Sequence, residues 1–220
     1  MTRLHPRERE VDHERLLGFT FTCLVIELTP GPNMAYLAVL SATAGRRSGF
    51  AATAGIALGL MAVGIGAALG LTALIGSSRW LYETWRWAGV LYLLWLAWEG
   101  WQSANETSPG DARVLQSDAT YFRRGLITNL LNPKAGIFYV AILPTFFDPS
   151  RPVASQAILL SVVYVVIATT IHSAIVLSAN AAEPWLNDPE RSITVRRVLS
   201  GALVAIALWL AYATRYSTIP

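Results

Sequence analysis

Two long stretches of the sequence carry no charged residue. The first lies between Arg47 and Arg79, and the second lies between Arg151 and Glu183. Each stretch is longer than the roughly 20 residues with which an α-helix crosses the hydrocarbon of a bilayer. The chain of 220 residues is 54% hydrophobic and 14% charged, whereas soluble domains have about 25% charged residues. These features predict an all-α integral membrane protein.

The hydrophobic residues fall into six segments, which we expect to be six transmembrane helices. The segments cover approximately residues 16–40, 50–75, 80–98, 125–147, 153–179 and 198–212. We expect residues 1–15 to be a charged N-terminal tail and residues 16–220 to be one domain. The hydrophilic connection 99–124 divides this domain into halves of about 16–98 and 125–215. Three spans in each half would invert the second half relative to the first, which is typical of transporters with inverted repeats.

The first segment is interrupted by Pro30, Gly31 and Pro32. Neither proline has an N–H group, and glycine adopts backbone dihedrals that other residues avoid. A membrane helix tolerates such a break only where other groups satisfy the freed backbone atoms. A second break is expected at Asn132-Pro133-Lys134 in the fourth segment. Because paired breaks in the two halves mark the binding site of many transporters, the sequence predicts a small transporter.

The composition argues against several other classes of protein. The net charge is +3, but the arginines are scattered and no basic helix or stripe suits a nucleic acid. Cys23 is the single cysteine, which excludes an intramolecular disulfide. The three histidines form no cluster with cysteine or acidic residues at the spacing of metal ligands. We therefore expect no metal centre and no cofactor.

Arginine and lysine in short connections predict how the chain is oriented, because cytoplasmic loops carry an excess of them. The connections after the first, third and fifth segments hold eight arginines, against three after the others, or four when Arg86 is counted. This difference places both termini in the periplasm. The four arginines of the N-terminal tail favour the opposite orientation.

Three motifs together resemble the LysE/RhtB family of amino-acid exporters. They are Thr29-Pro-Gly-Pro-Asn33, Gly45-Arg46-Arg47-x-Gly49-Phe50 and Asn132-Pro-Lys134. The resemblance covers nearly the whole chain after the tail, although the tail itself and Glu27 lie outside the family pattern. It implies an exporter in the bacterial inner membrane, driven by the proton gradient, that moves amino acids or similar small metabolites. By position, the substrate-binding elements would be Pro30, Gly31, Pro32 and Asn33 in the first break and Asn132, Pro133 and Lys134 in the second.

An amino acid is a zwitterion, so its binding site must offer a positive and a negative element a few ångströms apart. The N–H groups that open the helix at Asn33 would receive the carboxylate. Carbonyl groups freed near Leu28 and Thr29, together with Glu27, would receive the ammonium group. The alternative is that the prolines form a kink that serves only packing.

Three titratable residues inside hydrophobic segments are candidates for the site, because charge there is costly and usually faces a cavity or a partner. Lys134 would bind the carboxylate, pair with Glu27, or extend to the headgroups near Arg123 and Arg124. Glu27 is a candidate for proton coupling, because a carboxylate in an apolar setting holds a proton more readily than in water. The alternative makes it a structural partner of Lys134 or Asn129. His172 would relay protons, or bond to a neighbouring helix carbonyl.

Two other functions stay open on the sequence. One is a metal-ion exporter of the same fold superfamily, which would need paired acids or a cluster of histidine and cysteine within the membrane. The other is a membrane protein without transport activity, either an enzyme acting on lipids or a subunit of a complex. No nucleophile with a base is visible, so we expect no catalytic residue. The expected partners are the substrate, the proton and the bilayer; a homo-oligomer is compatible with the sequence.

Overall fold

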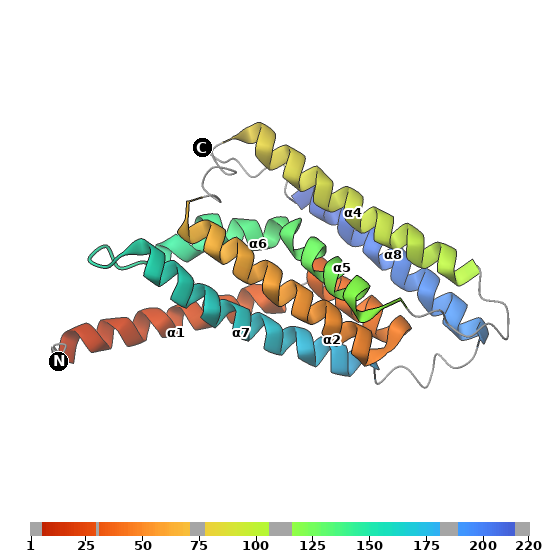
Figure 1. Cartoon of the computed structure of the whole chain (residues 1–220), viewed down its shortest axis with the longest axis horizontal. Coiled ribbons are helices and arrows are strands. Elements are labelled where there is room, and N and C mark those ends of the chain that lie inside the picture. The colour runs from red at the N-terminus through yellow and green to blue at the C-terminus, as the bar shows by residue number, and fades with distance from the viewer. Residues whose placement is uncertain (1–5, 30, 71–77, 106–115, 181–188, 214–220) are drawn as a thin grey trace.

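A computed structural model describes residues 6–29, 31–70, 78–105, 116–180 and 189–213. These residues contain helices and no strands, as the sequence predicts (Figure 1). The α-helices are α1 (Pro6–Leu28), α2 (Pro32–Ala68), α4 (Arg79–Asn105), α5 (Asp118–Leu130), α6 (Pro133–Ile137), α7 (Val153–Asn180) and α8 (Pro189–Ala213). A π-helical turn, η1 (Phe138–Ile142), and a 3₁₀ turn, η2 (Leu143–Phe146), follow α6.

Fewer spans are evident in the described residues than the six expected. Helices α2 and α7 are each long and apolar enough to cross a membrane. A third span is present if α5 and the bent segment Pro133–Phe146, at 49° to it, are counted together. Helix α4 carries Glu83 and Arg86 within its first turns, and only residues 197–212 of α8 are apolar. The count of six spans therefore stays a prediction.

Helix α2 reverses its direction at Gly45. The dihedrals of Gly45, φ 82° and ψ 170°, are not helical and lie in a region that glycine adopts readily and other residues avoid. On either side of it, Ser41 and Gly49 are so close that a Cβ atom on Gly49 would overlap the Ser41 hydroxyl. Eight residues of straight helix would separate these two positions by about 12 Å. Residues 32–44 and 46–68 are thus two arms of a helical hairpin.

The helices form two groups. Helix α2 packs against α5 and α7, and α1 lies along α7. Helices α4 and α8 pack against each other and lie along one side of the bundle, at the top of Figure 1. The segments of α1, α5 and α6 that adjoin the two helix breaks lie in the first group.

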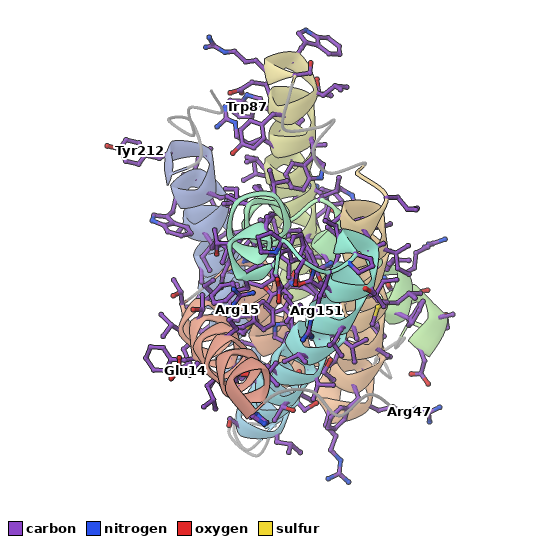
Figure 2. All side chains as sticks on the ribbon, turned by 90° about the vertical axis from the view of Figure 1, so that its left-hand side faces the viewer. Glu14, Arg15, Arg47, Trp87, Arg151 and Tyr212 are labelled. Atoms are coloured by element: carbon purple, nitrogen blue, oxygen red, sulfur yellow. The ribbon has the colours of Figure 1, made fainter. Side chains whose placement is uncertain are left out.

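Charged residues gather at the two ends of the bundle. At one end Arg47 pairs with Asp118 at 2.8 Å, and Arg124 pairs with Glu99 at 2.7 Å. At the other end Arg15 and Arg151 both approach Asp148, at 3.5 and 3.7 Å. Figure 2 labels these two arginines. Hydrogen bonds from Ser150, together with the charges of the two arginines, hold the pKa of Asp148 below its ordinary value. Most of the charged tail expected at residues 1–15 belongs to α1, which begins at Pro6.

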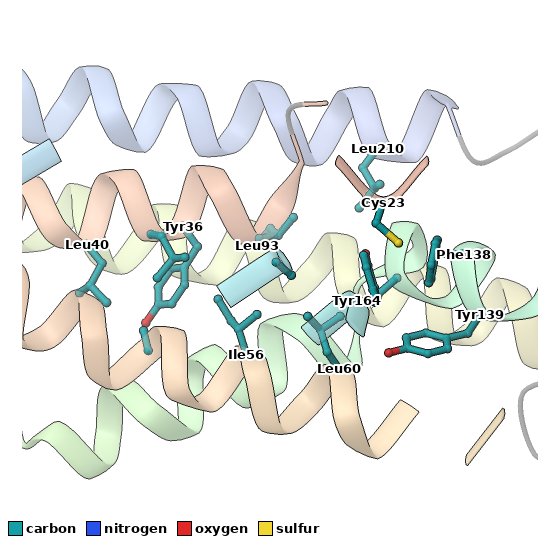
Figure 3. Close-up of a cluster of buried hydrophobic side chains, with 14 of the residues drawn as sticks. Cys23, Tyr36, Leu40, Ile56, Leu60, Leu93, Phe138, Tyr139, Tyr164 and Leu210 are labelled. Atoms are coloured by element: carbon teal, nitrogen blue, oxygen red, sulfur yellow. The ribbon is translucent and has the colours of Figure 1, made fainter. Parts of the chain in front are cut away.

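An aromatic cluster beside the first break connects α1, η1 and α7. The rings of Phe138 and Tyr164 stack with their centroids 4.0 Å apart, and Tyr139 meets Tyr164 edge to face (Figure 3). Phe19 of α1 packs against Phe138 from the other side. Because all four side chains are buried, the ring of Tyr164 is held in one orientation.

Candidate functional site

The helices are interrupted at both places where the sequence predicts a break. Helix α1 ends at Leu28, and α2 begins at Pro32 after the N-cap residue Gly31. Helix α5 ends at Leu130, and α6 begins at Pro133 after the N-cap residue Asn132. Proline suits the first position of a helix, since an N–H group there has no partner within the helix. Pro30 lies outside the described residues.

A cavity lies where the two breaks meet. It is small and partly open to solvent, with a volume of about 10 Å³, which is room for about one water molecule. Its lining consists of Glu27, Gly31, Asn33, Met34, Asn132, Lys134, Ala135, Tyr164 and His172. Six of the nine residues expected at the site are therefore together: Glu27, Gly31, Asn33, Asn132, Lys134 and His172. The prolines Pro32 and Pro133 are buried, begin the two helices and do not line the cavity.

Glu27 is held by two residues of α7. It is 5% exposed, and one of its carboxylate oxygens accepts a hydrogen bond of 2.5 Å from the Tyr164 hydroxyl. The other oxygen lies 3.3 Å from Nε2 of His172. A buried carboxylate requires such partners, because it is costly to remove from water without them. The described contacts of Glu27 are thus with Tyr164 and His172, whereas the sequence suggested Lys134 or Asn129.

Tyr164 was not among the residues expected at the site. It is one of eight tyrosines in the chain, and a tyrosine in an apolar segment is ordinarily part of the core. A signal was nevertheless present, because Tyr164 and His172 are eight residues apart. That spacing is slightly more than two helical turns and places both side chains on one face of α7.

Lys134 turns toward the break in α1. Its ammonium nitrogen donates a hydrogen bond of 2.6 Å to the carbonyl oxygen of Thr29, and its stem passes Gly31. The carbonyl groups at the C-terminal end of a helix lack partners within the helix and carry partial negative charge. The Lys134 ammonium therefore compensates the partial negative charge at the C-terminal end of α1. It does not extend to the headgroups near Arg123 and Arg124.

Asn132 fixes the second break, and an asparagine pair connects the first break to α5. The side-chain oxygen of Asn132 accepts a hydrogen bond of 3.0 Å from the backbone N–H of Lys134. Asn33 donates a hydrogen bond of 2.9 Å from Nδ2 to Oδ1 of Asn129. Asn33 is 6% exposed and Asn129 is fully buried. Oδ1 of Asn33, a residue that lines the cavity, has no hydrogen-bond partner among the described residues.

We expect the asparagine pair to be coupled energetically. Asn33→Leu or Asn129→Leu alone leaves a buried amide without its partner and should lower the free energy of unfolding by about 1–3 kcal/mol. The double variant should recover most of that loss, because two apolar side chains of similar shape replace both partners. Thermal unfolding of the four proteins in detergent measures the coupling. Equal losses that add in the double variant would show that the two amides act independently.

The described residues contain no group of three or more histidine, cysteine, aspartate or glutamate side chains that could hold a metal ion. Glu27 and His172 form a pair without a third such ligand. Groups of both signs instead lie near the two breaks: the ammonium of Lys134 is positive, whereas the Thr29 carbonyl that it contacts and the Glu27 carboxylate are negative. Such an arrangement can bind a small molecule that carries both charges.

The chain is similar to a family of translocators and to several bacterial membrane proteins. The family model described as LysE type translocator matches residues 24–214. The homoserine/homoserine lactone efflux protein of Salmonella typhimurium is 26% identical over 196 residues, which cover 89% of this chain and 95% of the relative. The leucine efflux protein of Enterobacter sp. strain 638 is 33% identical over 129 residues, 57% of this chain and 60% of the relative.

An uncharacterized membrane protein of Vibrio cholerae is 24% identical over 197 residues, which cover 90% of this chain and 96% of the relative. No solved structure matches the chain. The family match extends over nearly all of the sequence after the charged tail and includes both helix breaks. It confirms the resemblance drawn from the three motifs: the chain belongs to the LysE type translocator family.

Proposed function

We propose that this protein exports amino acids or related small metabolites across the bacterial inner membrane, and that the cavity between the two helix breaks is its substrate site. The observation that carries the proposal is the meeting of both breaks at one cavity that holds a carboxylate and an ammonium group. The relatives named as efflux proteins for homoserine, its lactone and leucine support a cargo of this size and chemistry.

We propose one orientation for a zwitterion bound here, and it requires the cavity to widen during transport because its volume is about 10 Å³. The carboxylate of the zwitterion would accept hydrogen bonds from the backbone N–H groups of Asn33 and Met34 at the start of α2, whose first arm covers residues 32–44. The next N–H group, that of Ala35, already donates to the carbonyl of Gly31. The ammonium group of the ligand would lie on the opposite side, near Glu27 and the Thr29 carbonyl. Asn33 Oδ1 would supply a further acceptor beside the cavity.

Transport would follow alternating access, with one half of the protein rocking against the other. The inverted repeat is supported by helix pairs that join corresponding spans of the two halves, because α2 packs on α7 and α4 packs on α8. In addition, residues 32–44 and α5 both run about 20 Å from a break to the end where Arg47 meets Asp118. That arginine-rich end would face the cytoplasm, with both termini in the periplasm.

Proton coupling would reside in Glu27 and His172. While Glu27 is ionised it holds the ammonium group of the substrate, and when it gains a proton that attraction is lost. A proton that enters from the periplasm would therefore release the substrate to that side, and loss of the proton to the cytoplasm would restore the site. His172 would pass the proton, and its distance of 3.3 Å from the carboxylate supports this role.

The test is export from bacterial cells loaded with dipeptides. Cells that contain the protein should release at least one amino acid faster than cells without it. Gly31→Leu should lower that release by about tenfold or more, because its side chain would fill the cavity beside Lys134. Gly201→Leu is the matched control, since Gly201 is exposed on α8 with no neighbour within 4 Å. If no amino acid in a broad panel leaves faster, the proposed function is wrong, and metal tolerance becomes the next assay.

A further inference from the structure

The ammonium group of Lys134 occupies the place where the proposed site would hold the ammonium of an amino acid. Its nitrogen lies 2.6 Å from the carbonyl oxygen of Thr29, and Glu27 lines the same cavity. The hydroxyl of Thr29 does not take part, because it donates to the carbonyl of Val25 at 2.9 Å. A cation is favoured at this end of α1 by the free carbonyl and by the helix dipole.

The side chain of Lys134 runs alongside Gly31, between the Thr29 carbonyl and the start of α2. It starts from the second residue of α6 and passes Gly31, where a Cβ atom would lie 3.2 Å from its Cδ atom. Glycine leaves this position open between the Thr29 carbonyl and the first N–H groups of α2. A lysine stem has four flexible carbons and carries a compact charge that can donate in several directions. A swing of the stem toward the start of α2 would bring the ammonium to a ligand carboxylate bound there.

We propose that the Lys134 ammonium takes the place of the substrate's ammonium group at the Thr29 carbonyl, and that its displacement determines which ligands the cavity accepts. In the structure this ammonium bonds to the Thr29 carbonyl. A free amino acid displaces it, because the ligand ammonium takes the carbonyl while the ligand carboxylate receives Lys134. The inference rests on the proposed function and adds a requirement: the ligand must carry a carboxylate next to its ammonium group.

A ligand whose carboxyl group is blocked cannot make this exchange. An amide retains the ammonium group but offers no anion to Lys134, so two cations would compete for Thr29 and Glu27. Like charges in so small a cavity repel each other strongly, because little water separates them. The cavity should therefore select free amino acids over their amides, and the selection should disappear when the charge of Lys134 is removed.

The experiment measures ligand binding to the purified full-length protein in detergent. The probes are the common amino acids and homoserine, followed by the amide of the amino acid that binds most tightly. Wild-type protein should bind the free acid at least about tenfold more tightly than the amide. Lys134→Met keeps a stem of similar length without the charge. It should weaken binding of the acid by about tenfold and leave the amide bound as well as before or more tightly.

Two control variants complete the set. Lys134→Arg should retain the preference for the acid, because it restores the positive charge. Arg151→Met removes an equal charge at the far end of the bundle, outside the cavity, and should also leave the preference unchanged.

Four outcomes would overturn the inference. Equal affinity of the wild-type protein for acid and amide would do so without any variant, even if Lys134→Met failed to fold. A preference that survives in Lys134→Met would exclude Lys134 as its origin. If Lys134→Met binds the acid and the amide equally weakly, Lys134 has a structural role. The proposed function would still stand in that case, because the wild-type protein binds the acid. Failure of every free amino acid to bind wild type would contradict the proposed function itself, and this inference with it.

Discussion

Glu27→Gln is expected to lower proton-driven export by about tenfold to a hundredfold while the protein stays folded. Glutamine has the shape of glutamate, and its amide oxygen can still accept the hydrogen bond from the Tyr164 hydroxyl. It cannot gain or lose a proton, and it carries no charge with which to hold an ammonium group. Both roles proposed for Glu27 therefore end with this substitution, although the packing around α7 is retained.

Proteoliposomes with an imposed pH gradient measure the effect directly. Wild-type protein should move the substrate in response to the gradient, and Glu27→Gln should not, whatever the direction of the gradient. Glu83→Gln is the matched control, because Glu83 pairs with Arg86 on α4 and does not line the cavity. A Glu27→Gln protein that responds to the gradient as the wild type does would exclude Glu27 from proton coupling.

The helix breaks could be read from the sequence because their cause is local. Proline lacks an N–H group wherever it stands, so Pro32 and Pro133 begin helices in the structure as their chemistry requires. The sequence also shows directly that the charged residues Lys134 and Glu27 lie within apolar segments. Six residues expected at the site consequently line one cavity.

The partners of these residues could not be read in the same way, because they depend on how distant helices pack. Glu27 meets Tyr164 and His172 across α1 and α7, more than 100 positions later in the chain. Asn33 of α2 contacts Asn129 of α5. Lys134 bonds to a backbone carbonyl, and a pattern of side chains in the sequence cannot predict a backbone partner. Periodicity assigns each residue to a helix face, but only the tertiary structure determines which faces come together.

Alanine at Gly55 or at Gly125 is expected to lower the free energy of unfolding by about 3 kcal/mol, near the upper end for overpacked sites. A Cβ atom on Gly55 would overlap the backbone carbonyl of Phe122, and one on Gly125 would overlap the carbonyl of Ala52. Small residues allow helices in a membrane to approach closely at such points. Since the obstructing atoms belong to the backbone, α2 and α5 would have to move apart.

Gly201→Ala is the matched control for these variants, and thermal unfolding in detergent is the measurement. Gly201 lies within α8 with no atom within 4 Å of an added Cβ, so alanine there should raise stability by about 0.5–1 kcal/mol. A Gly55→Ala protein as stable as the wild type would mean that α2 and α5 can separate at little cost.

The contact of α2 with α5 also bears on the cavity, because the same two helices carry Asn33 and Asn129 and lead into the two breaks. If the helices separate in Gly55→Ala, both the asparagine pair and the cavity lose their geometry. Transport should then fall together with the amount of folded protein. In Glu27→Gln, by contrast, transport should fall while the folded protein remains. Measuring stability and export for both variants side by side separates the residues that build the cavity from those that act in it.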